Sequence, residues 1–507
     1  MYFKTEVITA VAAWALSAAS LSFYSDCDYI EGGLCPRGDA DFQDLGKQLS
    51  SSAKVYFPGS SGFTELTTRW STLEEPKVNV VVVPGTENDV VQTVKYANKK
   101  EVPFLTFNGV HGALVSLGKM DHGVGISLSQ LNSIQIAKDG KTVTMGGGTM
   151  SKKVTDTLWA AEKQTVTGTC ECVSVLGPAL GGGHGWLQGH HGLVSDQFVS
   201  MNVVLADGTL KTINQDSDLW WAMKGAGHNF GIVTSLTSKI YDIEHHDWAI
   251  ETITLSGDKV EAVYQATNEH LLKNGAQPAE VITWSYWMNV PDIDASNPVI
   301  VLYIIQEGVK AVDPIYTKPF HDMAPLAIVP QAGTYKDLAA WTGIALDSPP
   351  CQNMGMANPR FPIYLETYDV AAQKMAWDIY APAVRGDSPF NFSIFMFEGY
   401  SAGGVHAIPS SSSAFAFRSE NILAAPLINY VPVDKALEDK AAALGNQLRN
   451  ILHEATGRTD IRAYVNYAHG TETTHQMYGD NKDRLLALKQ KYDPTGKFNF
   501  YAPIIDM

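Results

Sequence analysis

The chain has 507 residues, 45% of them apolar, and is long enough to bury a large core divided among two or three domains. Its formal net charge at pH 7 is -16. Nucleic-acid binding depends on clustered Lys and Arg, which the sequence lacks, so the charge argues against a polyanionic partner.

The N-terminus has the features of a secretory signal peptide. Lys4 precedes an apolar run over 7–16, and Ser17, Ala18 and Ala19 are small residues that suit signal peptidase. A short buried helix is the alternative. No other stretch approaches the roughly 18 consecutive apolar residues that a membrane span needs. We therefore expect a soluble protein that is secreted or enters the endomembrane system.

Five cysteines are an odd number, so at least one is unpaired or otherwise engaged in an oxidising compartment. Cys27 and Cys35 lie close together and could pair with each other, or with Cys351 or Cys172. A cofactor bond to Cys170 would account for the odd cysteine.

The first domain begins with a predicted βα unit. Residues 78–83 form a nearly continuous β-branched run, typical of a strand that is buried on both faces. Thr86 is the expected N-cap of a helix over 87–99. A second strand follows over 102–107.

That second strand leads into the loop Asn108, Gly109, Val110, His111 and Gly112. Two glycines around a histidine at a strand exit form a tight turn. Such a turn can present main-chain N–H groups to a diphosphate and an imidazole to the space above it. A purely structural His111 is the alternative.

A stretch rich in glycine and cysteine spans 165–194. Repeated glycine lets the backbone approach a ligand closely, and a neighbouring thiol is a nucleophile or a soft ligand. This combination suits a large flat cofactor held by main chain; the alternative is a glycine-rich turn with two buried free cysteines. The residues of interest in it are Gly168, Cys170, Cys172, Val173, Gly177, Gly181, Gly182, Gly183 and Gly185.

The first domain closes on Gly225, Gly227 and Gly231, followed by Ile232 and Val233. The glycine spacing is one residue too long for the dinucleotide fingerprint Gly-x-Gly-x-x-Gly, and it follows a predicted helix rather than a strand. A Rossmann-type nicotinamide site is therefore not expected.

These segments together resemble FAD-linked oxidoreductases of the vanillyl-alcohol-oxidase (PCMH) type, in particular the fungal-type berberine-bridge-enzyme-like branch. Members of that branch carry Gly-x-Cys, an apolar residue three places after the cysteine and a glycine triplet eleven places after it. Gly168, Cys170, Val173 and Gly181 occupy those places. The resemblance is close over 76–242 and includes the closing motif.

Residues 243–432 differ in pattern from the first domain. Predicted strands over 281–290 and 299–305 alternate with a helix over 259–273. Long antiparallel strands with helices on one face form an α+β substrate domain. Its recurrent tryptophans and tyrosines are either core or the lining of a pocket for a flat organic substrate.

Two further features stand out in this second domain. A strand over 393–399 contains Glu398, which we interpret as a solvated strand-end carboxylate, with an acid/base role as the alternative. Asn391 begins the only Asn-x-Ser/Thr sequon and is a candidate for one surface glycan.

The C-terminus resembles the same family again. Asp434 is the expected cap of an amphipathic helix. A strand over 462–467 would place Tyr464 and Asn466 on one face. Tyr464-Val-Asn466-Tyr467, with the later Tyr-Asp-Pro, matches the family's C-terminal segment.

The resemblance implies an α+β protein in which a two-part, PCMH-type FAD-binding domain carries a cap domain with a large antiparallel sheet. The expected parts are a signal peptide (1–20), the FAD-binding domain (21–242, core about 72–242), the substrate-binding cap (243–432) and a C-terminal segment that returns to the FAD-binding domain (433–507).

It also implies that FAD is covalently bound. His111 matches the family histidine that bonds the flavin 8α-methyl, although Val110 replaces the usual glycine, and Cys170 is a possible second anchor. The residues expected to bind FAD are Asn108, Gly109, His111, Gly112, Gly168, Cys170, Val173, Gly177, Gly181, Gly182, Gly183, Gly185, Ile232, Val233 and Asn466.

For catalysis, Tyr464 is the candidate base and Tyr467 its rival. A phenol needs nearby positive charge or hydrogen bonds for that role. In plant members a glutamate or glutamine acts beside the tyrosine, but the matching stretch 417–426 has proline or alanine at that place. Val173 falls on the oxygen-gating position, where valine accompanies oxidases.

The predicted function is thus an FAD-dependent oxidase that takes hydride from a secondary metabolite or a saccharide and is reoxidised by O2 to H2O2. A non-oxidising isomerase or cyclase, and a ligand-binding protein without turnover, are the alternatives. We expect a monomer. We also expect no catalytic metal, because the histidines lack carboxylate or cysteine partners at metal-ligand spacing. These histidines are His184, His190, His191, His245 and His246.

Overall fold

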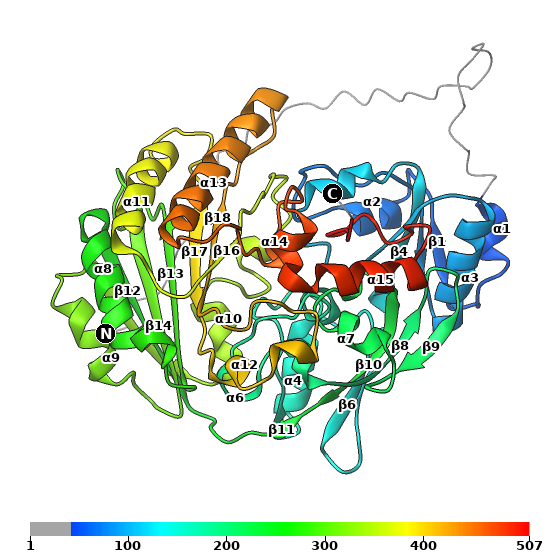
Figure 1. The fold of residues 1–507 in the computed structure, drawn as a ribbon, viewed down its shortest axis with the longest axis horizontal. Helices are drawn as coiled ribbons and strands as arrows, with labels where there is room; N and C mark the ends of the chain where they lie inside the picture. Colours follow the sequence, from blue (N-terminus) through cyan, green and yellow to red (C-terminus); the bar gives the residue numbers. More distant parts are fainter. Residues whose placement is uncertain (1–41, 506–507) are drawn as a thin grey trace.

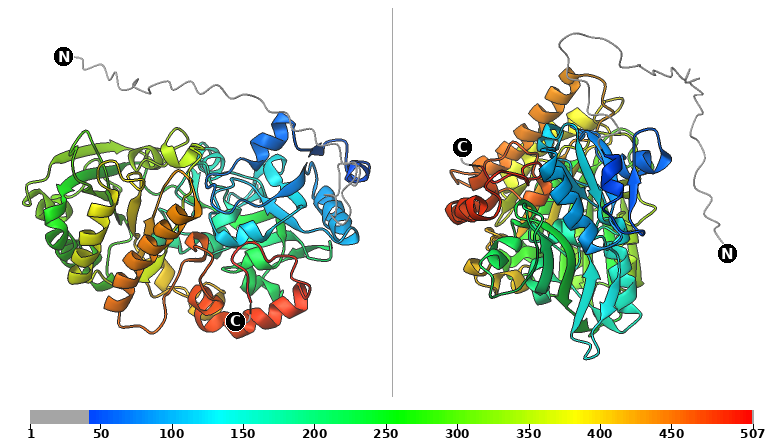
Figure 2. Two further views of the ribbon diagram at one scale, coloured as in Figure 1. Left: turned by 90° about the horizontal axis from the view of Figure 1, so that it is seen from above. Right: turned by 90° about the vertical axis from the view of Figure 1, so that its right-hand side faces the viewer.

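The computed structural model describes residues 42–505. The predicted signal peptide, Cys27 and Cys35 lie outside these residues. Three main sheets organise the chain (Figures 1 and 2), and the seven-stranded sheet with its helices lies beside the two smaller sheets. The predicted α+β fold with a large antiparallel sheet is confirmed.

The first sheet is mostly parallel and holds the predicted βα unit. Strands β2, β4 and β3 run parallel, and β1 is antiparallel to β2. Helix α3 (Glu87–Lys99) begins where predicted, because the Thr86 side chain accepts from the Asp89 N–H while the Asp89 carboxylate accepts from the Thr86 N–H. In sheet order the strands are β1 (Lys54–Tyr56), β2 (Val78–Val83), β4 (Gly123–Ser127) and β3 (Phe104–Phe107).

The second sheet is antiparallel, and its buried side chains share one hydrophobic cluster with those of α4 (Ser151–Trp159) and α7 (Leu219–Met223). Its last strand, β10, begins at Ile232, directly after the closing glycine motif. In sheet order the strands are β5 (Ile134–Ile136), β6 (Thr142–Gly146), β10 (Ile232–Lys239), β8 (Phe198–Val204) and β9 (Leu210–Ile213).

The third sheet has seven antiparallel strands, all between residues 248 and 427. One face is covered by α8 (Val260–Ala266), α11 (Val370–Val384) and α13 (Lys435–Ala455) (Figure 1). The other face turns toward the smaller sheets. In sheet order the strands are β15 (Ala327–Gly333), β12 (Trp248–Ser256), β14 (Val299–Glu307), β13 (Val281–Met288), β17 (Ile394–Gly399), β18 (Ile422–Leu427) and β16 (Ile363–Leu365).

Two predicted elements differ from the structure. The helix over 259–273 is α-helical only in α8 and continues as a π-helix over Thr267–Leu272. The strand over 462–467 is wrong, because Val465–Tyr467 form a 3-10 turn (η12). The Asn466 amide donates to the carbonyl oxygen of Pro178 at 2.8 Å, which holds this turn against the glycine-rich stretch instead of in a sheet.

The C-terminal segment joins the two halves of the molecule. Helix α13 begins at its Asp434 cap, as predicted, and packs against α11. Helix α15 (Lys482–Tyr492) then packs against α7 (Leu219–Met223), on the side of the smaller sheets (Figure 1). Within residues 42–505, no helix combines the length and the apolar character that crossing a bilayer requires.

Candidate active site

A cavity of about 680 Å³ lies where the first sheet, the glycine-rich stretch, the seven-stranded sheet and the C-terminal turn meet. A volume of this size accommodates a small-molecule ligand. The residues predicted from the sequence that line it are Asn108, Gly109, His111, Gly112, Gly168, Cys170, Val173, Gly177, Ile232, Val233, Tyr464, Asn466 and Tyr467.

The remaining predicted cofactor residues, Gly181, Gly182, Gly183 and Gly185, lie behind the cavity wall rather than in it. A Cβ on Gly181 would lie 2.2 Å from Asn466 Oδ1, and one on Gly185 would lie 2.1 Å from the carbonyl oxygen of Thr167. These glycines therefore allow the wall to pack closely against the segments behind it.

The loop over 108–112 presents main chain to the cavity. In the described part of the chain, no hydrogen-bond acceptor is found for the N–H groups of Gly109, Val110, His111 and Gly112. Val110 adopts φ +50°, a left-handed conformation that favours glycine. Glycine, the residue that the family resemblance leads one to expect at this place, adopts such a conformation without strain. Free N–H groups on a cavity wall suit the polar edges or the diphosphate of FAD.

The His111 imidazole is part of the cavity lining. Burial, together with the nearby positive charges of Arg360 and Arg69, lowers the pKa of His111 to about 4. Its ring stacks on Trp70 with centroids 5.5 Å apart. At neutral pH the ring is therefore uncharged and keeps a lone pair.

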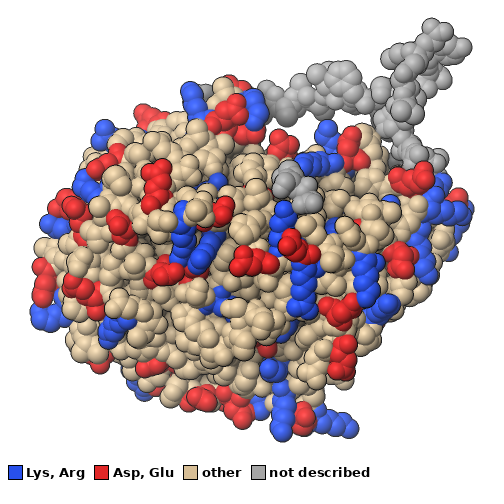
Figure 3. Space-filling model, in the orientation of Figure 1, with Lys and Arg blue, Asp and Glu red and all other residues tan. Residues whose placement is uncertain are grey.

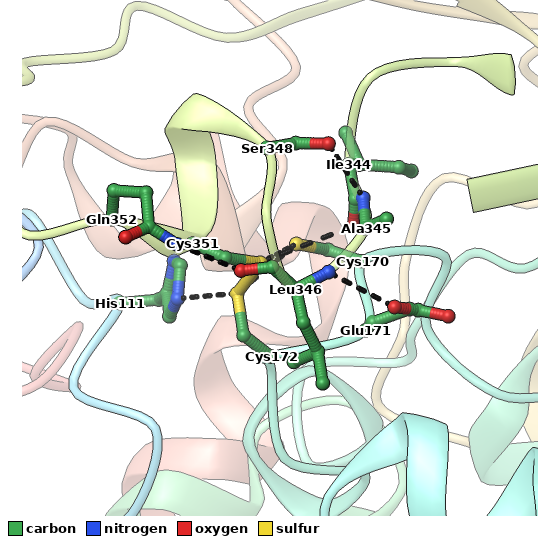
Figure 4. Close-up of a disulfide and its surroundings, with 10 residues drawn as sticks. All are labelled: His111, Cys170, Glu171, Cys172, Ile344, Ala345, Leu346, Ser348, Cys351 and Gln352. Atoms are coloured by element: carbon green, nitrogen blue, oxygen red, sulfur yellow. Dashed lines mark hydrogen bonds between the residues drawn. A yellow bond between two sulfur atoms is a disulfide. The ribbon is translucent and has the colours of Figure 1, made fainter. Parts of the chain in front are cut away.

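Three sulfur atoms gather beside this imidazole (Figure 4). Cys172 forms a disulfide with Cys351, and the Cys172 Sγ lies 3.2 Å from His111 Nε2. Any pairing of Cys27 or Cys35 with Cys172 or Cys351 is thereby excluded. Cys170 is free, with its Sγ 3.5 Å from Cys172 Sγ and 3.6 Å from Cys351 Sγ. Burial raises the pKa of the Cys170 thiol to about 11.

Glu398 is not the solvated carboxylate that the sequence indicated. Its side chain is 4% exposed and lines the cavity from β17. The Tyr467 hydroxyl donates to Glu398 Oε1 at 3.0 Å. Burial raises the pKa of Glu398 to about 7, while the hydrogen bonds from Tyr467 and Tyr400 and the charge of Arg360 act in the opposite direction.

The strand itself contained the signal for this placement. Successive side chains of a strand alternate between faces, so Ile394, Met396 and Glu398 share one face of β17. All three line the cavity, whereas Phe395 and Phe397 pack in the core beneath the helices.

The two predicted tyrosines have different surroundings. The Tyr464 hydroxyl accepts from the Asn466 amide at 2.7 Å, and its ring packs on His184 at 4.9 Å. The Tyr467 hydroxyl faces Glu398 instead. Burial raises the pKa of both phenols. Both phenols therefore stay protonated at neutral pH and cannot accept a proton in that form, and Tyr467 is the one hydrogen-bonded to a carboxyl group.

Arg360 is a cavity residue that the sequence gave no reason to expect. Its guanidinium lies over the rings of Tyr467 at 4.5 Å and Trp70 at 5.0 Å, and Nη2 donates to the carbonyl oxygen of His111 at 3.2 Å. It precedes no recognisable motif and comes from an irregular segment that bridges β18 at Leu427.

The histidines that lie close together in sequence have separate partners. His184 bonds the Tyr364 hydroxyl at 2.7 Å, and His190 pairs with Glu307 at 2.8 Å. Among residues 42–505, the one group whose ligand atoms could meet at a metal is the cysteine trio, in which two sulfurs are already bonded to each other.

Two family models match the chain. One describes an FAD binding domain and covers residues 78–214; the other, described as berberine and berberine like, covers residues 463–505. The first therefore spans the His111 loop and the glycine-rich stretch, and the second spans Tyr464 to Tyr467.

Similar proteins cover nearly the whole chain. FAD-linked oxidoreductase chyH of Penicillium rubens is 59% identical over 99% of this chain and 100% of its own length. FAD-linked oxidoreductase chry5 of Gibberella zeae is 52% identical, over 98% and 99%. The fold is shared with BBE-like 1 of Physcomitrella patens, with a TM-score of 0.78, 22% identity and coverage of 92% of this chain and 100% of that one.

The site fits the cofactor that these similarities imply. Unpaired main-chain N–H groups, an uncharged buried imidazole and a free thiol line one continuous cavity, and FAD held there would be bound by residues of the loop over 108–112, the glycine-rich stretch and η12. The chain belongs to the FAD-linked oxidoreductases of the vanillyl-alcohol-oxidase type, in the berberine-bridge-enzyme-like branch.

Proposed function

We propose that this enzyme is an oxidase in which Glu398 takes a proton from a substrate hydroxyl or amine as hydride leaves the adjacent carbon. Bound FAD supplies the hydride acceptor. The observation that carries the proposal is the buried Glu398 carboxyl group, with a pKa of about 7, hydrogen-bonded to Tyr467 on the cavity wall. A base whose pKa lies near the working pH is effective in proton transfer.

Tyr467 has a supporting role in this proposal. Its hydroxyl donates to Glu398 Oε1 and so orients the carboxyl group on the cavity wall. Burial raises the pKa of both groups, and the charge of Arg360, which lies over the Tyr467 ring, opposes that rise. Tyr464, the base favoured by sequence reasoning, instead holds η12 through Asn466.

Covalent attachment of FAD through His111, with Cys170 as a possible second anchor, is part of the proposal. An uncharged imidazole is the nucleophilic form, and the low pKa of His111 favours it at neutral pH. Acid-precipitated protein should retain yellow colour, and peptide mass spectrometry should locate the flavin. His111→Ala should release that colour when His111 is the single anchor, and His111→Ala combined with Cys170→Ser should release it when both residues hold the flavin. His228→Asn is the control, because His228 lines the same cavity but bonds the carbonyl oxygen of Gly177.

Reoxidation by O2 to H2O2 is the second half of the proposal. Val173 lines the cavity, at the position where a bulkier leucine accompanies dehydrogenases in the resembling family. Stopped-flow mixing of the reduced enzyme with O2 should show rapid reoxidation with stoichiometric peroxide. Val173→Leu should slow reoxidation while leaving anaerobic reduction unchanged, and absence of peroxide from the wild type would overturn the oxidase assignment.

The decisive experiment is anaerobic mixing of the enzyme with a panel of aromatic alcohols, cyclic amines and oligosaccharides. Bleaching of the flavin by one class, lost in Glu398→Gln, supports the oxidase. Product formation without bleaching would indicate the isomerase or cyclase, and no reaction with any class would indicate a binding protein. Saccharides belong in the panel because a xylooligosaccharide oxidase from Myceliophthora thermophila C1 shares the fold, with a TM-score of 0.77 and 19% identity over 91% of this chain and 99% of that one.

We also propose that the protein is exported and processed near Ala19. N-terminal sequencing of the protein secreted by a fungal host tests the cleavage. Loss of mass on enzymatic deglycosylation, absent from Asn391→Gln, tests the glycan.

A further inference from the structure

The Arg360 guanidinium is held rigidly at the cavity surface. It lies between the rings of Trp70 and Tyr467, and one of its N–H groups donates to the carbonyl oxygen of His111. Within residues 42–505 no carboxylate oxygen lies within 4.0 Å of it, so Arg360 forms no ion pair. The side chain lines the cavity, and no second acceptor among the described residues is found for its guanidinium.

The charge of the cavity lining differs from that of the whole molecule. The protein carries a net charge of -16, and acidic and basic side chains are intermingled on the face that Figure 3 shows. The described cavity lining instead contains the cations Arg69, Arg360 and Lys497 and a single carboxyl group, Glu398. With a pKa of about 7, that carboxyl group is only partly ionised at neutral pH. The cavity is therefore suited to anionic groups.

The three cations differ in what they can bind. Arg69 is enclosed, donates to the carbonyl oxygen of Gly112 at 2.9 Å and is influenced by the charge of Glu75. Lys497 precedes Phe498, which packs on Phe104 of the first sheet. Arg360 lies over the ring of Tyr467, and the hydroxyl of that tyrosine is hydrogen-bonded to Glu398. Of the three cations, Arg360 is therefore the one linked to the proposed base.

We propose that Arg360 is a substrate-binding residue, and that the substrate carries an anionic oxygen, a carboxylate or an ionised phenol, which pairs with its guanidinium. This inference rests on the proposed function only in identifying the ligand as the substrate. A planar guanidinium binds such a group through two parallel hydrogen bonds, and fixing it there would aim the rest of the molecule along the wall toward Glu398.

The cavity wall that the seven-stranded sheet forms beside Glu398 indicates the body of this substrate. Aromatic and thioether side chains from neighbouring strands line it, which suits a flat apolar skeleton rather than a polyhydroxylated one. These residues are Trp284, Tyr286, Met288, Tyr303 and Met396. The substrate class is thus an aromatic acid or acidic phenol that carries an oxidisable hydroxyl or amine.

Binding of matched probes to the purified holoenzyme at pH 7.5 tests the proposal, with dissociation constants measured by isothermal titration calorimetry. Benzoate is compared with benzamide, and pentafluorophenol with pentafluoroanisole. We expect at least one anion to bind roughly tenfold or more tightly than its neutral counterpart, as charge-assisted hydrogen bonds to a fixed guanidinium predict. The arm that shows this preference distinguishes carboxylate from phenolate. No preference in either arm would overturn the proposal without any variant.

Variants assign the preference to Arg360. Arg360→Gln should reduce it to about twofold or less, and Arg360→Lys should retain part of it. Arg385→Gln, at an exposed arginine outside the cavity lining, should leave it unchanged. A preference that survives in Arg360→Gln would refute the assignment. Because binding heat does not require turnover, an intact preference in an enzyme that oxidises nothing would refute the oxidase proposal alone. Turnover without any anion preference would refute the Arg360 proposal alone.

Discussion

The Cys172 Sγ lies 3.2 Å from His111 Nε2 and is bonded to Cys351, 179 residues further along the chain. The disulfide therefore fastens a segment from between the strands of the seven-stranded sheet to the glycine-rich stretch, beside the imidazole proposed to hold the flavin. It also leaves Cys170 as the free thiol of the trio.

Removal of this cross-link should destabilise the protein by an amount that depends on which cysteine is replaced. Cys351→Ser leaves no cysteine on the segment around residue 351 with which the cross-link could form again. It should therefore lower the free energy of unfolding by about 2–4 kcal/mol, as expected for a disulfide that closes a long loop. Cys172→Ser should cost less, because Cys170 Sγ is 3.6 Å from Cys351 Sγ and can take its place. Thermal unfolding midpoints and non-reducing peptide maps measure both effects.

The matched control for the cross-link is Cys170→Ser, which should keep the native disulfide and an unfolding midpoint close to that of the wild type. A free Cys351 in Cys172→Ser, together with a stability loss equal to that of Cys351→Ser, would show that Cys170 cannot substitute.

Glu398 should determine the pH dependence of flavin reduction. The carboxylate is the active form of a base, so the reduction rate should rise with pH and level off above about pH 7. Glu398→Gln should lower the plateau by roughly 10²–10⁴-fold and remove the inflection. Tyr467→Phe should move the inflection to higher pH, because the lost hydrogen bond favoured the carboxylate. Stopped-flow reduction from pH 5.5 to 9 measures these changes, and an inflection that persists in Glu398→Gln would assign it to another group.

The parts of the site that follow from local spacing could be predicted from the sequence, and the parts that depend on tertiary neighbours could not. The loop around His111 and the stretch around Cys170 are each a short continuous segment. The residues within each segment therefore reach the cavity together. The burial of Glu398 depends on β17 lying between β13 and β18. Arg360 reaches the cavity because its irregular segment bridges β18. The alternation along β17 indicates that Glu398 shares a face with Met396, but no local pattern indicates the neighbouring strands that bury it or the bridge that brings Arg360 to the cavity.

The roles of the tyrosines illustrate the same limit. The two-residue period of the predicted strand placed Tyr464 and Asn466 on one face. Their side chains are in contact, but in a 3-10 turn rather than in a strand. That turn directs the Tyr467 hydroxyl to a carboxyl group 69 residues away in the chain, which no local period could indicate.

Glu398 should also lower stability at the pH at which it works. Its pKa is about 7 in the folded protein against 4.5 as the ordinary value, so the folded state binds the proton more tightly. The free energy of unfolding therefore has its full value below about pH 4.5, falls as the pH rises to about 7 and stays reduced at higher pH. The deficit at pH 8 is up to about 3 kcal/mol. Glu398→Gln should be more stable than the wild type at pH 8 and gain little at pH 5, measured by urea unfolding. An equal gain at both pH values would contradict the titration of Glu398 as the cause.

Val110 should be a site where glycine stabilises the protein. Its φ of +50° is strained for a β-branched residue, at about 1–3 kcal/mol, whereas glycine adopts it freely but loses about 0.5–1 kcal/mol of chain entropy on folding. Val110→Gly should therefore raise the free energy of unfolding by up to about 2 kcal/mol, and Val110→Ala by less. Flavin content per chain should stay at least as high, because the N–H groups of the loop keep their orientation. A lower unfolding midpoint in Val110→Gly, with intact flavin content, would mean that packing of the valine side chain outweighs the backbone strain.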